Sequence, residues 1–191
     1  MSEMIEVRWH GRGGQGAKTA AYLLAESAME GGKYIQAFPE YGPERMGAPI
    51  QSFTRISERP IRMHCSVRTP SVVVVLDPTL LEAVDVFDGV PEEDGVVVVN
   101  TEESPGALRT SLGVSGRKIF TVPATHIALE TMGRPIPNTP MIGALIRATG
   151  LLDLEHIVAD IREKFGKKFG SKVAEGNIKA IRRAYEEVQG E

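Results

Sequence analysis

Two short runs of β-branched residues, at 71–76 and 96–99, are the clearest hydrophobic pattern in this chain. Apolar residues fill consecutive positions in both runs rather than alternating with polar ones. Such runs are typical of strands covered on both faces, as in a mostly parallel sheet. Further strands are predicted at residues 5–10, 33–38 and 118–122.

Residues 51–56 and 61–64 show a different pattern, in which apolar and polar residues alternate. Successive side chains of a strand point to opposite faces, so alternation predicts strands with one solvated face. The short segment 57–60 between them predicts a hairpin.

Helical periodicity follows the first strand. Small apolar residues recur there at i, i+3, i+4, i+7 and i+11, namely Ala17, Ala20, Ala21, Leu24 and Ala28. We therefore expect a helix that begins near Gln15 or Gly16 and lies close against the sheet. Another helix is predicted to begin at Asn138-Thr139-Pro140, a polar cap followed by proline, and to end at Gly150.

The C-terminal part of the chain is predicted to be helical. Asp153 is expected to cap a helix whose buried stripe is Leu154, Ile157, Val158, Ile161 and Phe165. A last helix over 171–188 is expected to bury Ile178, Ile181, Tyr185 and Val188. The pattern predicts one α/β domain over residues 1–191, with a mostly parallel sheet, helices on both faces and a helical C-terminal tail.

A glycine-rich segment, Gly11-Arg12-Gly13-Gly14-Gln15-Gly16, joins the first predicted strand to the first predicted helix. Its glycines have the G-x-G-x-x-G spacing of a strand–turn–helix phosphate site. Without Cβ atoms the backbone turns tightly, and its N–H groups approach an anion at the positive end of the helix.

The position of the first acid argues against a nicotinamide dinucleotide as the ligand. A dinucleotide fold places an acid about 20 residues after the glycines, at the end of the second strand. That count reaches Gln36. The predicted second strand ends at Phe38-Pro39, and the first acid, Glu40, lies beyond the proline.

Residues 38–49 are predicted to lack regular structure, because they contain three prolines and two glycines. The segment also holds Tyr41, Glu44, Arg45 and Met46. Tyr, Arg and Met are residue types enriched at protein interfaces. Two interpretations remain: a loop that fills a local gap, or a binding loop near the glycine-rich segment.

Composition narrows the chemistry further. Formal net charge is −3, without the basic field that nucleic acid binding requires. The chain has one cysteine, Cys65, and four scattered histidines, so iron–sulfur and zinc sites are not expected. Cys65 is interpreted as a small buried residue rather than a reactive thiol. No apolar run has the ~20 residues that span a bilayer, so we expect no membrane contact and a cytoplasmic location.

The catalytic motifs of common enzyme classes are missing. We find no Gly-x-Ser-x-Gly, no phosphate loop with its Gly-Lys-Ser/Thr end, and no His-Glu-x-x-His. An anion site without a catalytic group suggests a non-catalytic subunit.

Three segments together resemble the gamma subunit of the 2-oxoacid:ferredoxin oxidoreductases, and most closely that of the pyruvate enzyme. They are the glycine-rich segment 11–16, residues 37–49 and residues 73–78. The likeness covers nearly the whole chain, including Asn138-Thr139-Pro140-Met141 and the helical tail.

The resemblance implies a multi-subunit enzyme that converts pyruvate and coenzyme A to acetyl-CoA, carbon dioxide and reduced ferredoxin. It implies alpha, beta and delta subunits as partners. Thiamine diphosphate, magnesium and iron–sulfur clusters would be held by those partners only, and this chain would serve coenzyme A binding and assembly.

Placed on this sequence, the resemblance suggests a coenzyme A contact at the glycine-rich segment. The N–H groups of Gly13, Gly14, Gln15 and Gly16 would face phosphate oxygens, Arg12 would add charge, and Gln15 and Thr19 would add hydrogen bonds. Alternatively, Arg12 and Gln15 brace the loop or contact a partner. Tyr41, Glu44, Arg45 and Met46 would form a loop facing a partner or the substrate.

Two other classes of function stay open. One is a stand-alone nucleotide-binding α/β protein. The other is a scaffold subunit whose glycine-rich segment packs on a partner without a ligand.

Overall fold

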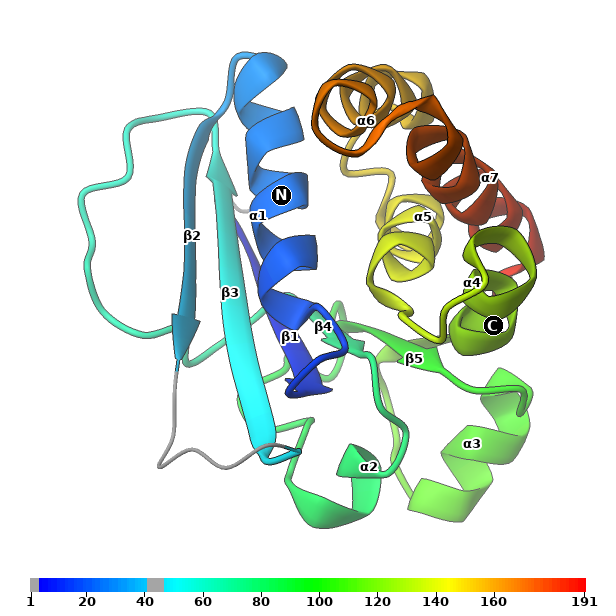
Figure 1. Ribbon diagram of the computed structural model, residues 1–191. Helices are drawn as coiled ribbons and strands as arrows, with labels where there is room; N and C mark the ends of the chain where they lie inside the picture. The colour runs from blue at the N-terminus through cyan, green and yellow to red at the C-terminus, as the bar shows by residue number, and fades with distance from the viewer. Residues whose placement is uncertain (1–3, 41–46) are drawn as a thin grey trace.

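The computed structural model describes residues 4–40 and 47–191, which build one sheet with helices on both faces (Figure 1). The strands are β1 (Met4–Arg12), β2 (Tyr34–Glu40), β3 (Pro49–Ser57), β4 (Val72–Val75), β5 (Val96–Asn100), β6 (Lys118–Val122) and β7 (Gln189–Gly190). The helices are α1 (Ala17–Glu30), α2 (Leu80–Ala83), α3 (Pro105–Leu112), α4 (Ala124–Met132), α5 (Asn138–Thr149), α6 (Leu154–Phe169) and α7 (Ser171–Glu187). The predicted α/β class with a helical C-terminal part is confirmed.

The centre of the sheet is parallel, in the order β1-β4-β5-β6, with β2, β3 and β7 added antiparallel at its edges. The two β-branched runs form the central strands β4 and β5. Val74 and Val98 pack into one hydrophobic core, whereas Val73 and Val97 pack into a second core on the opposite face. The continuous runs are therefore strands covered on both faces, as predicted.

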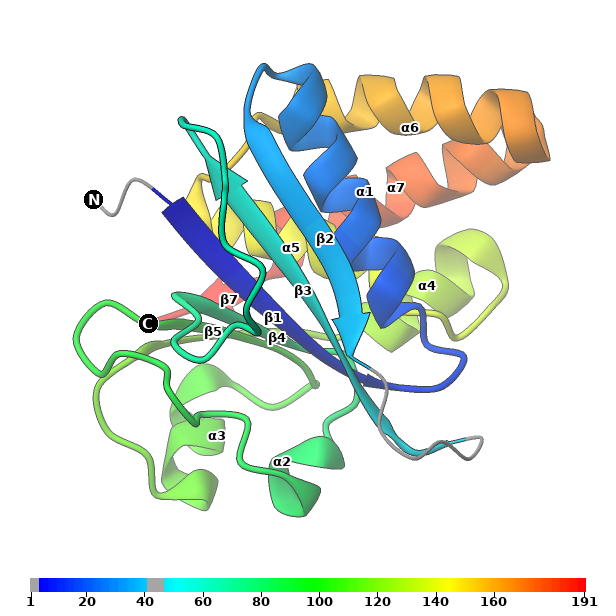
Figure 2. The same cartoon turned by 90° about the vertical axis from the view of Figure 1, so that its left-hand side faces the viewer.

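The two faces carry helical layers of unequal depth (Figures 1 and 2). On one face lie α1 and α5, backed by α4, α6 and α7. On the other face lie the short helices α2 and α3. The predicted stripe of α1 is fully buried, and α5 is buried from Thr139 to Ile146. Within the described residues, no helix combines the length and apolar character needed to cross a bilayer.

The predicted hairpin between residues 51–56 and 61–64 is wrong. The first segment forms β3, which lies between β1 and β2 and pairs with both. Its alternating polar residues are not solvated, because Thr54 is buried, donating to Ala21 O at 2.9 Å and accepting from Trp9 Nε1 at 3.1 Å. Residues 61–64 form no strand.

The prediction that residues 38–49 lack regular structure is wrong at both ends of that segment. Strand β2 continues through Pro39 to Glu40, and β3 already begins at Pro49. Proline is tolerated in β2 because this strand lies at the edge of the sheet and needs no partner on its outer side.

The cap predicted at Asn138 is also wrong, although the helix is present and ends at Gly150 as predicted. Pro137 occupies the cap position, and the Asn138 carboxamide instead accepts from Thr139 N at 2.8 Å. The other cap is confirmed, since Asp153 accepts from His156 N at 3.0 Å.

Cys65 is exposed, contrary to the prediction of a buried residue. It belongs to the connection between β3 and β4, most of which lies on the surface. The Arg55 guanidinium lies 3.9 Å from its Sγ. The prediction rested on the general tendency of free cysteines to be buried. It is wrong here because the connection between β3 and β4 runs outside the sheet.

Candidate functional site

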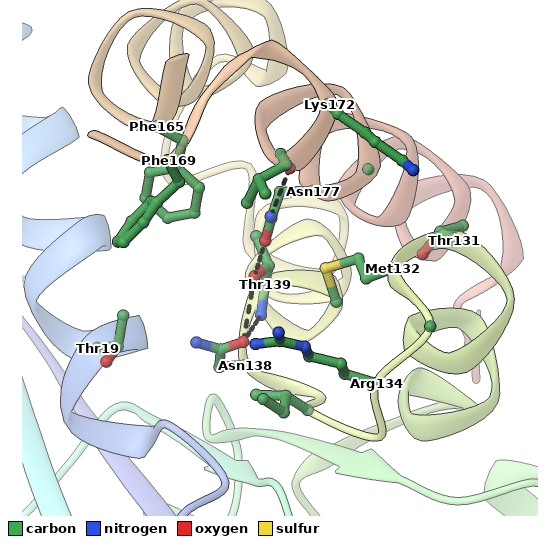
Figure 3. Close-up of a pocket in the computed structure, with 14 residues that line it drawn as sticks. Thr19, Thr131, Met132, Arg134, Asn138, Thr139, Phe165, Phe169, Lys172 and Asn177 are labelled. Carbon is green, nitrogen blue, oxygen red and sulfur yellow. Dashed lines mark hydrogen bonds between the residues drawn. The ribbon is translucent and has the colours of Figure 1, made fainter. Parts of the chain in front are cut away.

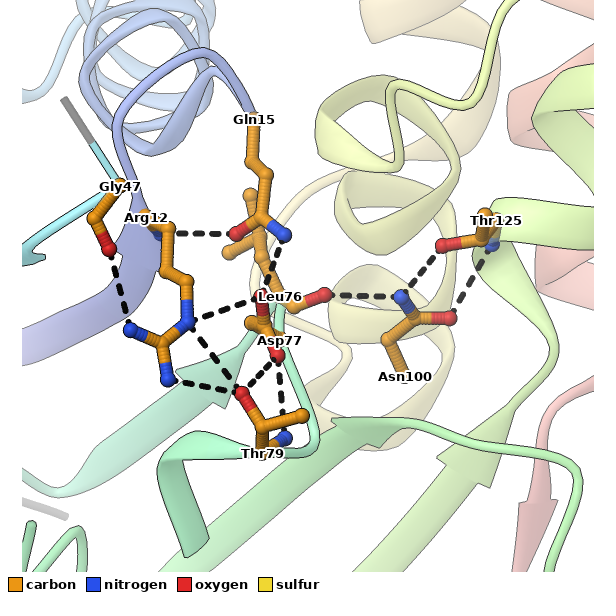
Figure 4. A network of polar contacts seen from close by, with 8 residues as sticks. All are labelled: Arg12, Gln15, Gly47, Leu76, Asp77, Thr79, Asn100 and Thr125. Carbon is orange, nitrogen blue, oxygen red and sulfur yellow. Dashed lines mark hydrogen bonds and ion pairs between the residues drawn. The ribbon is translucent and has the colours of Figure 1, made fainter. Parts of the chain in front are cut away.

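The glycine-rich segment lies where the sheet changes its direction of winding. The chain leaves β1 through α1 on one face, and leaves the neighbouring strand β4 through α2 on the other. Such switch points, at the carboxyl ends of parallel strands, are where open α/β sheets bind ligands. The loop after β1 and the residues after β4 meet there (Figure 4).

The loop has the geometry of an anion site. Gly14 and Gly16 have φ of +94° and +83°, which L side chains rarely adopt. Gly13 and Gly14 are exposed, and no acceptor among the described residues pairs with their N–H groups. Helix α1 begins directly after Gly16, so its first turn adds unpaired N–H groups and the positive end of its dipole.

Arg12 and Gln15 point inward, to a carboxylate that the sequence analysis did not single out (Figure 4). Gln15 bridges Arg12 N, at 2.7 Å, to Asp77 Oδ2, also at 2.7 Å. The Arg12 guanidinium lies 3.3 Å from Asp77 Oδ2 and donates to Thr79 Oγ1 and Gly47 O. Both side chains therefore brace the loop, and their contact with a ligand stays a prediction.

Asp77 is the centre of this network. Burial alone would raise the pKa of its carboxyl, but hydrogen bonds from Thr79 and Gln15 and the charge of Arg12 bring it below its usual value. The carboxylate neutralises Arg12, which leaves the backbone N–H groups as the main positive feature of the loop.

Asn100, at the end of β5, extends the bracing to the next strand. Its amide donates to Leu76 O at 2.8 Å and to Thr125 Oγ1 at 2.7 Å, and it accepts from Thr125 N at 3.1 Å. The ends of β4 and β5 and the first turn of α4 are thereby held together (Figure 4).

Asn138 packs against the last glycine of the loop. A Cβ atom on Gly16 would lie 2.7 Å from Asn138 Nδ2, and L side chains rarely adopt its φ of +83°, so a substitution here would be strained and would displace Asn138. Asn138 and the predicted site residue Thr19 both line a cavity beside the loop (Figure 3). The sequence placed Asn138 at a helix start but held no signal that it would meet Gly16.

Glu40 has a different position from the one predicted. Glu40 does end the second strand, contrary to the prediction that the strand stops before it. However, β3 is inserted between β1 and β2, which puts β2 two strand spacings, roughly 10 Å, from β1. A dinucleotide fold pairs those strands directly, so the topology argues against that arrangement. The predicted loop residues Tyr41, Glu44, Arg45 and Met46 lie outside the described residues.

One cluster away from the loop has the composition of a metal site. Glu30, His156 and Asp160 bring their ligand atoms within 4.8 Å of one another. His156 Nε2 lies 3.0 Å from Ser27 O, and Lys164 Nζ lies 2.6 Å from Glu30 Oε1. These contacts join the end of α1 to α6. The cluster therefore serves as an ionic and hydrogen-bonded link between the two helices. The sequence analysis missed it, because only folding brings His156 to Glu30.

Comparison with known proteins gives a consistent result. The family model of pyruvate ferredoxin/flavodoxin oxidoreductase matches residues 6–187. Pyruvate synthase subunit PorC of Thermotoga maritima is 52% identical over 185 residues, covering 97% of this chain and 95% of that protein. The common gamma subunit of the pyruvate/ketoisovalerate oxidoreductases of Pyrococcus abyssi is also 52% identical, over 97% of this chain and 98% of its own.

Solved structures agree. The crystal structure of pyruvate oxidoreductase subunit PORC from Thermotoga maritima matches with a TM-score of 0.86 and 48% identity, covering 99% of each chain. A 2-oxoglutarate:ferredoxin oxidoreductase from Magnetococcus marinus, solved with coenzyme A and succinyl-CoA, contains the same fold in 31% of its chain. Its TM-score is 0.77, at 19% identity. The fold, the family model and the relatives together show that the chain belongs to the pyruvate ferredoxin/flavodoxin oxidoreductase family, as a gamma subunit of the PorC type.

Proposed function

We propose that this chain serves a multi-subunit 2-oxoacid:ferredoxin oxidoreductase by contributing to coenzyme A binding and to assembly. The observation that supports the proposal most is the 52% identity to PorC over nearly the whole of both chains. Pyruvate is the favoured substrate of the complex, which would form acetyl-CoA, carbon dioxide and reduced ferredoxin.

The glycine-rich loop is the proposed contact for the coenzyme A diphosphate. Its exposed N–H groups and the start of α1 supply hydrogen-bond donors for phosphate oxygens. Apart from its chain neighbours, no described residue has a heavy atom within 4 Å of a Cβ built on Gly14, which leaves room for a phosphate. A structure with this fold contains coenzyme A, in the Magnetococcus marinus protein.

The remaining chemistry is assigned to partner subunits. We propose alpha, beta and delta subunits that hold thiamine diphosphate, magnesium and iron–sulfur clusters, with ferredoxin as the acceptor. The Pyrococcus abyssi relative is common to pyruvate and ketoisovalerate oxidoreductases. We therefore expect the choice of oxoacid to be made largely by the other subunits.

Purification of this chain from its native cell through an affinity tag tests the subunit role. We expect thiamine- and cluster-bearing subunits to co-purify, and the eluate to oxidise pyruvate only when coenzyme A is present. A chain recovered alone and stabilised by NAD or NADP would instead support a stand-alone nucleotide-binding protein.

Substitution of Gly14 tests the loop itself. Gly14→Leu should raise the KM for coenzyme A about tenfold or more, the loss expected when one or two hydrogen bonds to a charged group are removed. Gly32→Leu is the matched control, because Gly32 has a similar φ of +83° and open surroundings at the other end of α1. Equal coenzyme A kinetics in both variants would leave the chain as a scaffold without a ligand.

A further inference from the structure

A cluster of metal-ligand side chains lies where the end of α1 meets α6 (Figures 1 and 2). Glu30 comes from α1, and His156 and Asp160 come from α6; a ligand atom of each lies within 4.8 Å of the other two. The two α6 residues are four apart, a spacing that places them on one face of the helix. His156 Nε2 lies 3.8 Å from Asp160 Oδ2. Ligands bound to zinc at about 2.0–2.2 Å lie roughly 3.4 Å apart in a tetrahedral site, so this pair needs little movement.

The cluster holds more negative than positive charge. Glu26 and Glu30 lie at the end of α1, whose last turn has no basic residue and whose dipole has its negative end there. Asp160 adds a third carboxylate, which is only 8% exposed. Among the described residues, Lys164 is the lysine or arginine that pairs with these acids, at 2.6 Å from Glu30 and 3.4 Å from Glu26. Three carboxylates therefore share one ammonium group, and a divalent cation would balance the excess.

Two present contacts would be exchanged for such an ion. His156 Nε2 lies 3.0 Å from Ser27 O, and its lone pair would turn to the ion instead. Ser27 O keeps a partner, since it also accepts from Gly31 N at 3.1 Å. Lys164 contacts two glutamates and would keep one of them. The Asp160 carboxylate accepts from Ser27 Oγ, but with about four acceptor sites it can still bind an ion.

We propose that Glu30, His156 and Asp160 bind one divalent transition-metal ion, with zinc as the best fit. An imidazole nitrogen beside two carboxylates suits zinc better than magnesium or calcium, which take oxygen ligands. Glu30 lies on the exposed side of the cluster, which leaves a fourth position for water. The ion is structural, because it ties α6 to the end of α1, the helix that follows the glycine-rich loop. The sequence analysis expected no zinc site, since the histidines are scattered along the chain.

Zinc chloride titrated into the purified chain tests the site. The chain carries Cys65→Ser, so that the exposed thiol does not compete for the ion. Calorimetry should give one site, and zinc at about a hundred times its Kd should raise Tm by about 5–10 °C. Asp160→Asn, which can still accept from Ser27, and His156→Gln should each abolish this shift. The zinc-free Tm of each variant shows that it folds.

His126→Gln is the matched control on α4. His126 Nε2 also lies 3.2 Å from a carboxylate one turn along its helix, that of Glu130. No third ligand joins this pair within the described part of the chain. The zinc response of the control should therefore equal that of the parent chain.

Lys164→Gln separates a metal site from a simple ionic link between helices. Without the competing ammonium group, zinc affinity should rise about two- to fivefold. The zinc-free chain should unfold at a lower temperature, because an ion pair is lost. X-ray absorption of the zinc-bound chain should show nitrogen and oxygen ligands at about 2.0 Å and no sulfur.

Two results would overturn the proposal. One is a Tm that zinc leaves unchanged, and the other is a shift that persists in both Asp160→Asn and His156→Gln. The cluster would then be a metal-free link. If a ligand variant fails to fold, the Lys164→Gln affinity and the absorption spectrum decide, since a fall in affinity or a sulfur ligand contradicts the site.

Discussion

At the scale of single residues, Arg8 and His10 form a buried polar pair on β1, on the face opposite α1. Arg8 Nε donates to His10 Nε2 at 3.0 Å, and its Nη2 donates to the carbonyl oxygens of Val86 and Asp88. The ring nitrogen that accepts this bond cannot also carry a proton. Burial and the Arg8 charge accordingly lower the pKa of His10 to about 3.

This shift predicts a pH dependence of stability. The unfolded chain takes up a proton at His10 near pH 6.5, whereas the folded chain does so only near pH 3. The contribution of His10 to the free energy of unfolding is therefore fully present above pH 6.5. It is lost as the pH drops toward 3, by about 1.4 kcal/mol per pH unit.

His10→Gln isolates the effect, because its side-chain oxygen can accept from Arg8 without titrating. In urea unfolding at pH 6.5, 5.5 and 4.5, the wild type should lose stability more steeply than the variant. Parallel curves would contradict a buried neutral His10.

Only part of the hydrogen-bonded network at the glycine-rich loop could be predicted from the sequence. Spacing alone identified a glycine turn that begins a helix, and the structure has one. It did not identify Asp77, because a carboxylate that binds Arg12 and Gln15 comes from a different strand, brought alongside only by the β1–β4 pairing.

At the scale of elements, α5 and α7 approach so closely that Gly143 meets backbone. A Cβ on Gly143 would lie 2.2 Å from Ile181 O. Gly143→Ala should destabilise the fold by about 1–3 kcal/mol, because two packed helices must separate.

In the neighbouring helix α6, we expect Gly166→Ala to have the opposite effect on stability. Nothing lies within 4 Å of a Cβ there, so alanine should stabilise the fold by up to about 1 kcal/mol through its better helix propensity. Thermal or urea unfolding of the two variants checks the pair. A neutral Gly143→Ala would show that α5 and α7 can shift apart at little cost.

The pairing of strands could not be predicted from the hydropathy pattern. Alternation in residues 51–56 was visible, but it arises from buried Thr54 and Arg55 rather than from a solvated face. Thr54 is satisfied by Trp9 and by Ala21 O, and Arg55 by Glu6 and Gln36. Those partners lie on other elements, so hydropathy alone cannot distinguish such a strand from a half-exposed one.

At the scale of the whole molecule, the layered architecture was predictable because it follows from local patterns. Continuous β-branched runs indicated central parallel strands, and helical stripes indicated the layers that cover them. The order of strands and the cavity lined by α1, α4, α5, α6 and α7 depend on contacts among segments far apart in the chain. The same limit explains why the sequence did not link Thr19 to Asn138: nothing local to either residue indicates the cavity that both line.

The contact between Gly16 and Asn138 has an evolutionary consequence. A side chain at position 16 would require both an unfavourable backbone conformation and a smaller neighbour at position 138. We therefore expect a residue other than glycine at position 16 to be tolerated only where position 138 carries a smaller side chain. The local G-x-G-x-x-G motif shows the glycine at position 16 but not its contact with Asn138. This is why a motif scan assigns the loop to dinucleotides, although packing within the fold itself already demands the glycine.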